Sequence, residues 1–259
     1  MGIFTKKELK YIILTALVVA FAFAFDDKQP TFQLSFWLLN FLKTSLIVVI
    51  AALIHILAQK ITAYKYKAIA EYKIWEIRQI LFWTAGKFPI KLEFGPFKIT
   101  LSGLPAGIII SLLVAFLSLG KIFFITVSSF AVTSISPHRI GIHRFKNVTE
   151  LEEGVIAASG PIANLFFAFI LHAINQDLFA QAVFINLMFA IFSMIPISTL
   201  DGAKMFFGSL MLYFIVLIFI ILSIIFINLI PIGLTIFLGI LIAAVASIFI
   251  YMAFRFTPY

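Results

Sequence analysis

The chain has 259 residues, of which 63% are hydrophobic and only 12% are charged. Soluble domains carry about 25% charged residues, so this composition excludes an ordinary soluble protein and indicates a polytopic membrane protein. The sequence contains no cysteine, which excludes disulfide bonds and thiolate metal sites. The formal net charge of +8 alone would also fit a nucleic-acid-binding protein, so the placement of the basic residues has to decide between these classes.

Eight apolar runs, each bounded by charged residues or by Gly, Pro or Asn, are candidate membrane spans. A helix needs roughly 20 apolar residues to cross a bilayer, and about 17 suffice. The runs therefore predict an all-α polytopic membrane protein with about 6–8 transmembrane helices, organised as a single integral membrane domain over residues 1–259. They cover residues 9–25, 34–58, 103–119, 122–136, 155–174, 178–197, 205–227 and 231–254.

The first run follows three lysines and ends in Ala22-x-Ala24, which resembles a signal-peptidase site. Because many spans follow it, we expect a retained signal anchor and not a cleaved peptide. The neighbouring runs at 103–119 and 122–136 are the weakest candidates for membrane spans. They are either two spans or one bent or re-entrant hairpin around Gly120 and Lys121.

The largest segment outside the predicted spans lies between the second and third runs. Within it, KLEFGPFKIT (residues 91–100) alternates polar and apolar residues about a Gly-Pro turn. This pattern predicts a small cytoplasmic or interfacial β-hairpin. The hairpin is either an interfacial packing element or an edge strand that captures an extended peptide.

The basic residues orient the spans. If the N-terminus is cytoplasmic and the spans alternate, sixteen of the nineteen Lys and Arg residues fall on the cytoplasmic side. Only Lys28, Lys43 and Lys121 fall outside. This asymmetry matches the positive-inside rule. We therefore predict a multi-pass protein of the plasma membrane with its N-terminus and main basic loops in the cytoplasm, and no nucleic-acid partner.

Polar side chains at membrane depth are expensive, and they often mark functional sites. His55 lies near the cytoplasmic end of the second run, and Gln59, four residues later, shares its helix face. One interpretation is purely structural: His55 is a buried histidine that hydrogen-bonds to this glutamine or to a neighbouring helix. The alternative is the remnant of the His-Glu-x-x-His zinc-binding pattern, with Ile56 and Gln59 at the positions of the glutamate and the second histidine.

Two further polar features lie on the same predicted side. Gly160 and Pro161 should break or bend the fifth run, or start its helix, and Asn164 would offer an amide either to a substrate backbone or to another helix. Asp201 follows the sixth run. It is either a metal ligand or the partner of Lys204 in a local ion pair.

Together, these three features resemble the site-2 protease family of intramembrane zinc metalloproteases. That family carries His-Glu-x-x-His on one span, Gly-Pro-x-x-Asn on a later span and Leu-Asp-Gly shortly afterwards. Here the corresponding stretches are His55-Ile56-Leu57-Ala58-Gln59, Gly160-Pro161-Ile162-Ala163-Asn164 and Leu200-Asp201-Gly202. The resemblance covers about residues 45–207.

The resemblance implies that His55 and Asp201 correspond to two of three zinc ligands, and that the Gly160–Asn164 stretch corresponds to the substrate-binding motif. Gln59 stands in place of the second histidine ligand and Ile56 in place of the general base. A catalytic zinc normally has three protein ligands and a bound water. The site is therefore incomplete, and we expect no cofactor unless the missing ligand is restored.

These considerations predict a non-catalytic, site-2-protease-like membrane protein that binds transmembrane segments or peptides without cleaving them. Its expected partners are the lipid bilayer and transmembrane helices of other proteins. One alternative is a small transporter or channel with broken helices and Asp201 as its ion site. Another is a weakly active metal-dependent intramembrane protease.

Overall fold

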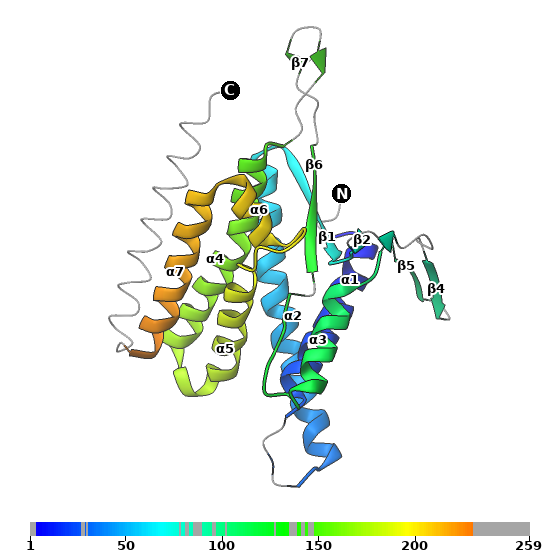
Figure 1. Ribbon diagram of the computed structural model, residues 1–259. Helices are drawn as coiled ribbons and strands as arrows, with labels where there is room; N and C mark the ends of the chain where they lie inside the picture. Colours follow the sequence, from blue (N-terminus) through cyan, green and yellow to red (C-terminus); the bar gives the residue numbers. More distant parts are fainter. Residues whose placement is uncertain are drawn as a thin grey trace.

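The fold is a helical bundle with short two-stranded antiparallel sheets mainly at one end (Figure 1). The computed structural model describes residues 4–26, 29, 31–77, 79–80, 83–84, 90–94, 97–101, 103–126, 128–134, 139–140, 143–144 and 148–229. The predicted span at 231–254 lies outside these residues.

The helix α4 (Glu150–Ile174) is the centre of the bundle. It packs against α2 (Leu34–Lys65), α5 (Gln176–Phe192), α6 (Asp201–Gly208) and α7 (Leu210–Leu229). Its apolar side chains join those of α5 and α7 in the largest buried cluster. The bundle is thus built around the helix that carries the Gly-Pro-x-x-Asn stretch.

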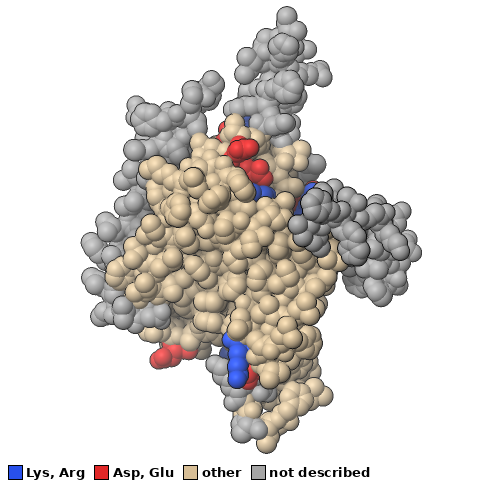
Figure 2. All heavy atoms as spheres, viewed as in Figure 1, with Lys and Arg blue, Asp and Glu red and all other residues tan. Residues whose placement is uncertain are grey.

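Within the described residues, three helices are long and apolar enough to cross a membrane: Leu34–Lys65, Glu150–Ile174 and Leu210–Ile227. The apolar helices Ala106–Leu117 and Gln176–Phe192 have fewer than the 18 residues required of a candidate span. Three is fewer than the 6–8 spans that the apolar runs predict. Figure 2 shows a broad uncharged belt on the viewed face, with acidic and basic groups confined to its two ends. The long apolar helices and this belt suggest a membrane protein.

The first helix, α1 (Lys6–Ala24), packs against α2 and against α3 (Ala106–Leu117). A buried polar cluster fixes its first turn. The carboxylate of Glu8 accepts hydrogen bonds from Lys60 Nζ at 2.6 Å, from the backbone N–H of Tyr72 at 3.0 Å and from that of Thr5 at 2.8 Å. One side chain therefore ties the start of α1 to α2 and to the strand β1 (Ala68–Ile74).

Burial of the Glu8 carboxyl raises its pKa, but the hydrogen bonds from Lys60, Thr5 and Tyr72 and the charge of Lys60 outweigh that effect. The pKa of Glu8 therefore lies below its ordinary value. A carboxylate that accepts several hydrogen bonds is stabilised in its charged form.

The stretch 103–136 contains a helix and a strand, and the prediction of a second membrane helix at 122–136 is wrong. After α3 the chain turns at Gly120, whose φ of +75° lies in the left-handed region, and returns to β6 (Ser128–Ser134). Figure 1 shows this return from the lower end of α3. The aromatic Phe130 and the β-branched Val132 and Thr133 favour a strand, and β6 pairs antiparallel with β1. The all-α prediction is corrected accordingly.

The predicted hairpin is confirmed in its backbone. The strands β4 (Ile90–Phe94) and β5 (Phe97–Leu101) pair antiparallel, with Phe94 opposite Phe97. Two minimal pairs also occur: β2 (Gln79–Ile80) with β3 (Trp83–Thr84), and β7 (Arg139–Ile140) with β8 (His143–Arg144).

The expected break at Gly160-Pro161 does not occur, because α4 continues through both residues. Its start is set earlier by a capping box, in which Thr149 and Glu152 each bind the other's backbone N–H. Pro161 lacks an N–H for the carbonyl of Ala157 one turn before it, yet the packing around α4 holds the helix together. The apolar run 205–227 is interrupted instead, at Ser209 between α6 and α7.

Candidate functional site

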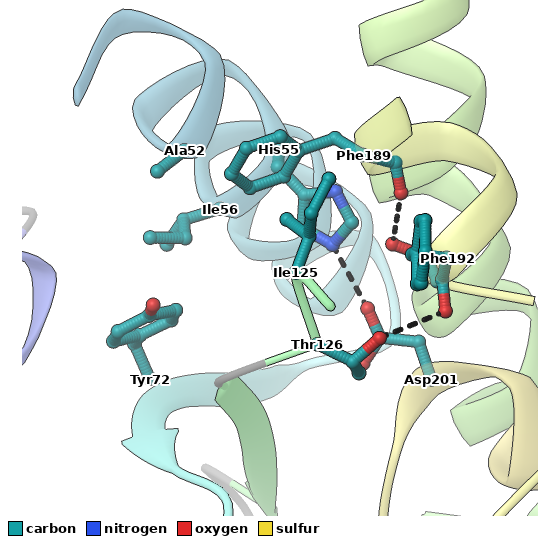
Figure 3. A pocket seen from close by; sticks show the side chains of 10 residues that line it. Ala52, His55, Ile56, Tyr72, Ile125, Thr126, Phe189, Phe192 and Asp201 are labelled. Carbon is teal, nitrogen blue, oxygen red and sulfur yellow. Dashed lines mark hydrogen bonds and ion pairs between the residues drawn. The ribbon is translucent and has the colours of Figure 1, made fainter. Parts of the chain in front are cut away.

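Three side chains of the metalloprotease-like motifs meet at one point. His55 Nε2 lies 2.8 Å from Asp201 Oδ2, and Gln59 Nε2 lies 2.8 Å from the same oxygen and 3.0 Å from His55 Nε2. All three residues are buried. Figure 3 shows the imidazole of His55, on α2, directed at the carboxylate of Asp201. We call these three residues the His55–Gln59–Asp201 triad.

One protonation pattern satisfies the shortest contacts of the triad. The Gln59 amide donates to Asp201 Oδ2, and His55 donates from Nε2 to the same oxygen; this tautomer follows from the hydrogen-bond network. In the described part of the chain, the other buried atoms, His55 Nδ1 and Asp201 Oδ1, have no hydrogen-bond partner. In this pattern Gln59 Nε2 and His55 Nε2 are both donors, so the 3.0 Å contact between them is not a hydrogen bond. The two side chains are held together by their shared acceptor, Asp201 Oδ2.

Local geometry explains why these residues can meet. His55 and Gln59 lie one turn apart on the same face of α2. Asp201 is the first residue of α6, directly after the buried Leu200. Gly202 follows, and a Cβ there would lie 2.5 Å from the Met194 and Ile195 carbonyl oxygens, so glycine lets α6 begin against the preceding loop.

Gly160 has a comparable role between α2 and α4. A Cβ on Gly160 would lie 2.4–2.7 Å from three atoms of the His55 ring. The absent side chain thus lets the imidazole lie directly against α4. Sequence reasoning marked Gly160 as a helix breaker, whereas the structure uses it for close approach.

Asn164 lies one turn beyond Gly160 on α4 but does not contact the triad in any recorded hydrogen bond. Its side chain is fully buried, and neither amide atom has a partner among the described residues. Asn164 also does not line the pocket beside His55 and Asp201. The structure therefore brings together His55, Gln59 and Asp201 from the metalloprotease-like motifs, and Asn164 stays outside these contacts.

Ile56 packs among apolar side chains and also lines the pocket beside His55 and Asp201. It is 2% exposed and packs in a cluster with Tyr11, Ile12, Tyr72 and Ile74. Figure 3 shows Ile56 on the Tyr72 side of α2. The position that carries a glutamate in the metalloprotease motif is therefore part of the apolar contact between α1, α2 and β1.

Lys204, which the sequence offered as an alternative partner of Asp201, contacts Glu153 and Phe130. Its Nζ lies 3.2 Å from Glu153 on α4, donates to the Phe130 carbonyl of β6 and sits over the Phe130 ring. Burial lowers the pKa of Lys204 from its ordinary value, against the opposing charges of Asp201 and Glu153. The local ion pair between Asp201 and Lys204 is replaced by contacts that join α6 to α4 and β6.

A pocket opens beside His55 and Asp201, and sequence reasoning missed most of its wall. Thr126 donates from Oγ1 to the Phe192 carbonyl at 3.1 Å, and Ser193 donates to the Phe189 carbonyl at 2.7 Å (Figure 3). The motifs gave no signal for these residues, because hydroxyl residues in apolar runs are common. The pocket is lined by Ala52, His55, Ile56, Tyr72, Ile125, Thr126, Phe189, Phe192, Ser193 and Asp201.

The donor set does not fit a catalytic zinc ion. Such a site needs three protein ligands and an open position. His55 and Asp201 supply two, and the Gln59 amide nitrogen, a hydrogen-bond donor, stands where a third ligand would be required. Within the described residues, no group of three or more His, Cys, Asp or Glu side chains is arranged to hold a metal. The side chains of His138 and His143 lie outside the described residues.

Comparison with known proteins finds a relative over most of the chain. Over 214 residues the chain is 28% identical to the protein named "Putative zinc metalloprotease MJ0611" of Methanocaldococcus jannaschii, with 79% of this chain and 86% of that protein covered. No family model and no solved structure matches the chain. The similarity supports a metalloprotease-like family.

Proposed function

We propose that the protein is a non-catalytic member of the site-2 protease family that binds transmembrane segments or unwound peptides without cleaving them. The observation that supports this most is the Gln59 amide, which hydrogen-bonds Asp201 and lies 3.0 Å from His55 Nε2. A hydrogen-bonded contact thus takes the place of metal coordination. The similarity to a protein named as a zinc metalloprotease supports descent from an enzyme.

Two losses separate the site from hydrolysis. A metal held by His55 and Asp201 alone would be undercoordinated. Ile56 offers a hydrocarbon side chain in an apolar cluster, so it cannot take a proton from an attacking water. General acid–base catalysis contributes typically about 10²–10⁴-fold, and its loss would cripple a site that also lacks a ligand.

The remaining parts of the proposal concern the membrane. We place the protein in the plasma membrane with the N-terminus and basic loops in the cytoplasm, on the strength of the charge asymmetry. The 6–8 spans would include the stretch 231–254. The partners would be the bilayer and the transmembrane helices of other proteins, and no cofactor would be bound.

Metal analysis of the purified protein tests the proposal. We expect substoichiometric zinc in the unmodified protein, and no cleavage of a transmembrane reporter. Gln59→His supplies a third ligand beside His55 and Asp201 and should raise the bound zinc, while Ile56→Glu alone should not. Only the double variant has both the ligand and the base that cleavage requires.

The control is the double variant with the added change Asp201→Ala, which should lose its zinc again. Stoichiometric zinc in the unmodified protein, or reporter cleavage that a chelator abolishes, would refute the proposal. That result would support the second candidate, a weakly active metal-dependent protease, which the similarity to a protein named as a zinc metalloprotease favours.

A further inference from the structure

The connection between α3 and β6 runs past the pocket of the triad. It consists of Ile122–Thr126, which form neither helix nor strand, and we call it the return segment. In Figure 1 it rises from the lower end of α3 to the start of β6. The turn before it lies beside the end of α1, because Gly120 packs against Asp26 and Phe25.

Aromatic contacts hold the return segment on two sides. The ring of Phe123 lies 4.8 Å from that of Phe23 on α1. The ring of Phe124 lies 6.4 Å from that of Trp75 and 6.0 Å from that of Phe192. The return segment therefore contacts α1 through Phe123 and the end of α5 through Phe124, and it lies between these two helices.

The upper part of the return segment forms a wall of the pocket. Ile125 and Thr126 line it together with His55 and Asp201 (Figure 3). Ile125 is 4% exposed, and the hydroxyl of Thr126 is tied to the Phe192 carbonyl. A non-helical stretch of this chain thus lies beside the residues that correspond to a protease centre.

The backbone of the return segment is unusual for its surroundings. Within the described part of the chain, the N–H and C=O groups of residues 123–126 make no backbone hydrogen bonds. Non-helical backbone at membrane depth is tolerated where it is buried in protein or lines a cavity. An unwound peptide bound beside the triad would present the same features: non-helical backbone, apolar side chains and a site wall.

We infer that the return segment occupies, in cis, the place of an unwound peptide beside the triad, and that a partner peptide has to displace it. This inference rests on the proposed function. It also states the chemistry of the partner. The partner is an apolar stretch with an aromatic residue at the place of Phe124, between Trp75 and Phe192, and a hydroxyl residue at the place of Thr126.

The absence of cysteine from the chain allows a direct test. Ser193→Cys places one thiol in the pocket wall, where the side chain is 9% exposed. In membranes or nanodiscs, a small membrane-permeant maleimide should label it slowly. Adding Phe124→Ala and Thr126→Val removes the ring contacts and the hydroxyl tie, and labelling should become faster by roughly tenfold, the factor that about 1.4 kcal/mol gives.

Two controls separate release of the segment from general loosening. Phe116→Ala removes an aromatic side chain from α3 whose contacts are with Phe21 and Phe25, and it should leave the labelling of Ser193→Cys unchanged. Ser223→Cys, on α7 and 1% exposed, should label equally slowly with and without the two changes in the segment. An unchanged rate at position 193, or equal acceleration at both positions, would overturn the inference.

A second experiment, in which a peptide is added, distinguishes this inference from the proposed function. The probe is a synthetic apolar peptide that contains the stretch Phe-Phe-Ile-Thr. It should protect Ser193→Cys from labelling at lower concentration when the segment carries Phe124→Ala and Thr126→Val. Equal protection of both proteins would refute displacement. Protection of neither, with labelling accelerated as expected, would support the position of the segment and count against peptide binding.

Discussion

Gly160 lies against His55 so closely that a methyl group on it would fall 2.4 Å from the imidazole Nε2. That nitrogen is the atom that contacts both Asp201 and Gln59. The contact between α2 and α4 therefore sets the position of the atom on which the triad depends.

The first prediction is that Gly160→Ala destabilises the protein by about 1–3 kcal/mol, the usual cost of an added methyl group in a tightly packed site. Reversible unfolding in mixed detergent, followed by tryptophan fluorescence, would measure it. Gly154→Ala is the matched control on the same helix. A Cβ there meets its nearest atom at 3.1 Å, and the helix propensity of alanine offsets the smaller clash by up to about 1 kcal/mol. Equal effects of the two changes would contradict the prediction.

The second prediction concerns the energy of the triad. Asp201→Asn should cost about 1–3 kcal/mol, because His55 and Gln59 both contact the same carboxylate oxygen and their charge-assisted hydrogen bonds become weaker bonds to a neutral amide oxygen. Combining it with Gln59→Leu should cost less than the sum of the single changes, since the first weakens and the second removes the same hydrogen bond. Asp177→Asn, exposed at the start of α5, is the control and should be nearly neutral. Strict additivity of the two changes would show that the contact contributes no stability.

A third prediction is an acid-dependent loss of stability through Glu8. Its folded pKa is lowered, so its contribution is complete at pH values above the unfolded carboxyl pKa of about 4.3 and is lost as the pH falls through the folded pKa. Glu8→Gln should therefore destabilise by about 3 kcal/mol at neutral pH, because the partly buried Lys60 amine loses its carboxylate partner and keeps its bond to the Ala70 carbonyl.

The difference between the unmodified protein and Glu8→Gln should shrink below about pH 4. Melting temperatures at pH 7, 5 and 3.5 would check this. Glu71→Gln removes a more exposed carboxylate, 3.7 Å from Lys73, and should change the melting temperature little at any of these pH values. A difference for Glu8→Gln that stays constant with pH would mean that the carboxylate charge is not responsible.

The fourth prediction is topological. The sixteen-to-three charge split places Lys65 in the cytoplasm and the start of α5, with Asp177, outside. Both side chains are exposed, and the chain has no cysteine of its own. In intact cells, an impermeant maleimide should label Asp177→Cys and not Lys65→Cys. The reverse pattern would invert the orientation.

The triad could be predicted from the motifs because its members are polar residues, which are rare in the apolar runs of this chain, and because they occur in a fixed order. His55 and Asp201 are separated by 146 positions, and yet their side chains lie within hydrogen-bond distance. Helix periodicity placed Gln59 on the same face as His55, and the structure agrees. Asn164 was placed on the correct helix, but its depth relative to the triad depends on how α2 and α4 cross, which no local pattern encodes.

The errors have physical causes as well. The stretch 122–136 is apolar, and apolarity alone does not distinguish a membrane helix from a strand buried at the end of a bundle. Only the pairing of β6 with β1, more than fifty residues earlier, decides between them. Glu8 was missed for a similar reason, since a glutamate near the N-terminus resembles a solvated helix start until Lys60 and Tyr72 are seen around it.

The spacing of these contacts along the chain orders the assembly of the protein during synthesis. The contacts of Glu8 join residues 52 and 64 positions apart, and they can form once α1, α2 and β1 have left the ribosome. His55 belongs to the same early portion of the chain, but its acceptor is Asp201, which is synthesised 146 residues later. Until then, the nascent chain carries a polar ring on α2 without that acceptor. The interval between the synthesis of α2 and that of α6 is therefore the period in which the His55 ring has to be accommodated without Asp201.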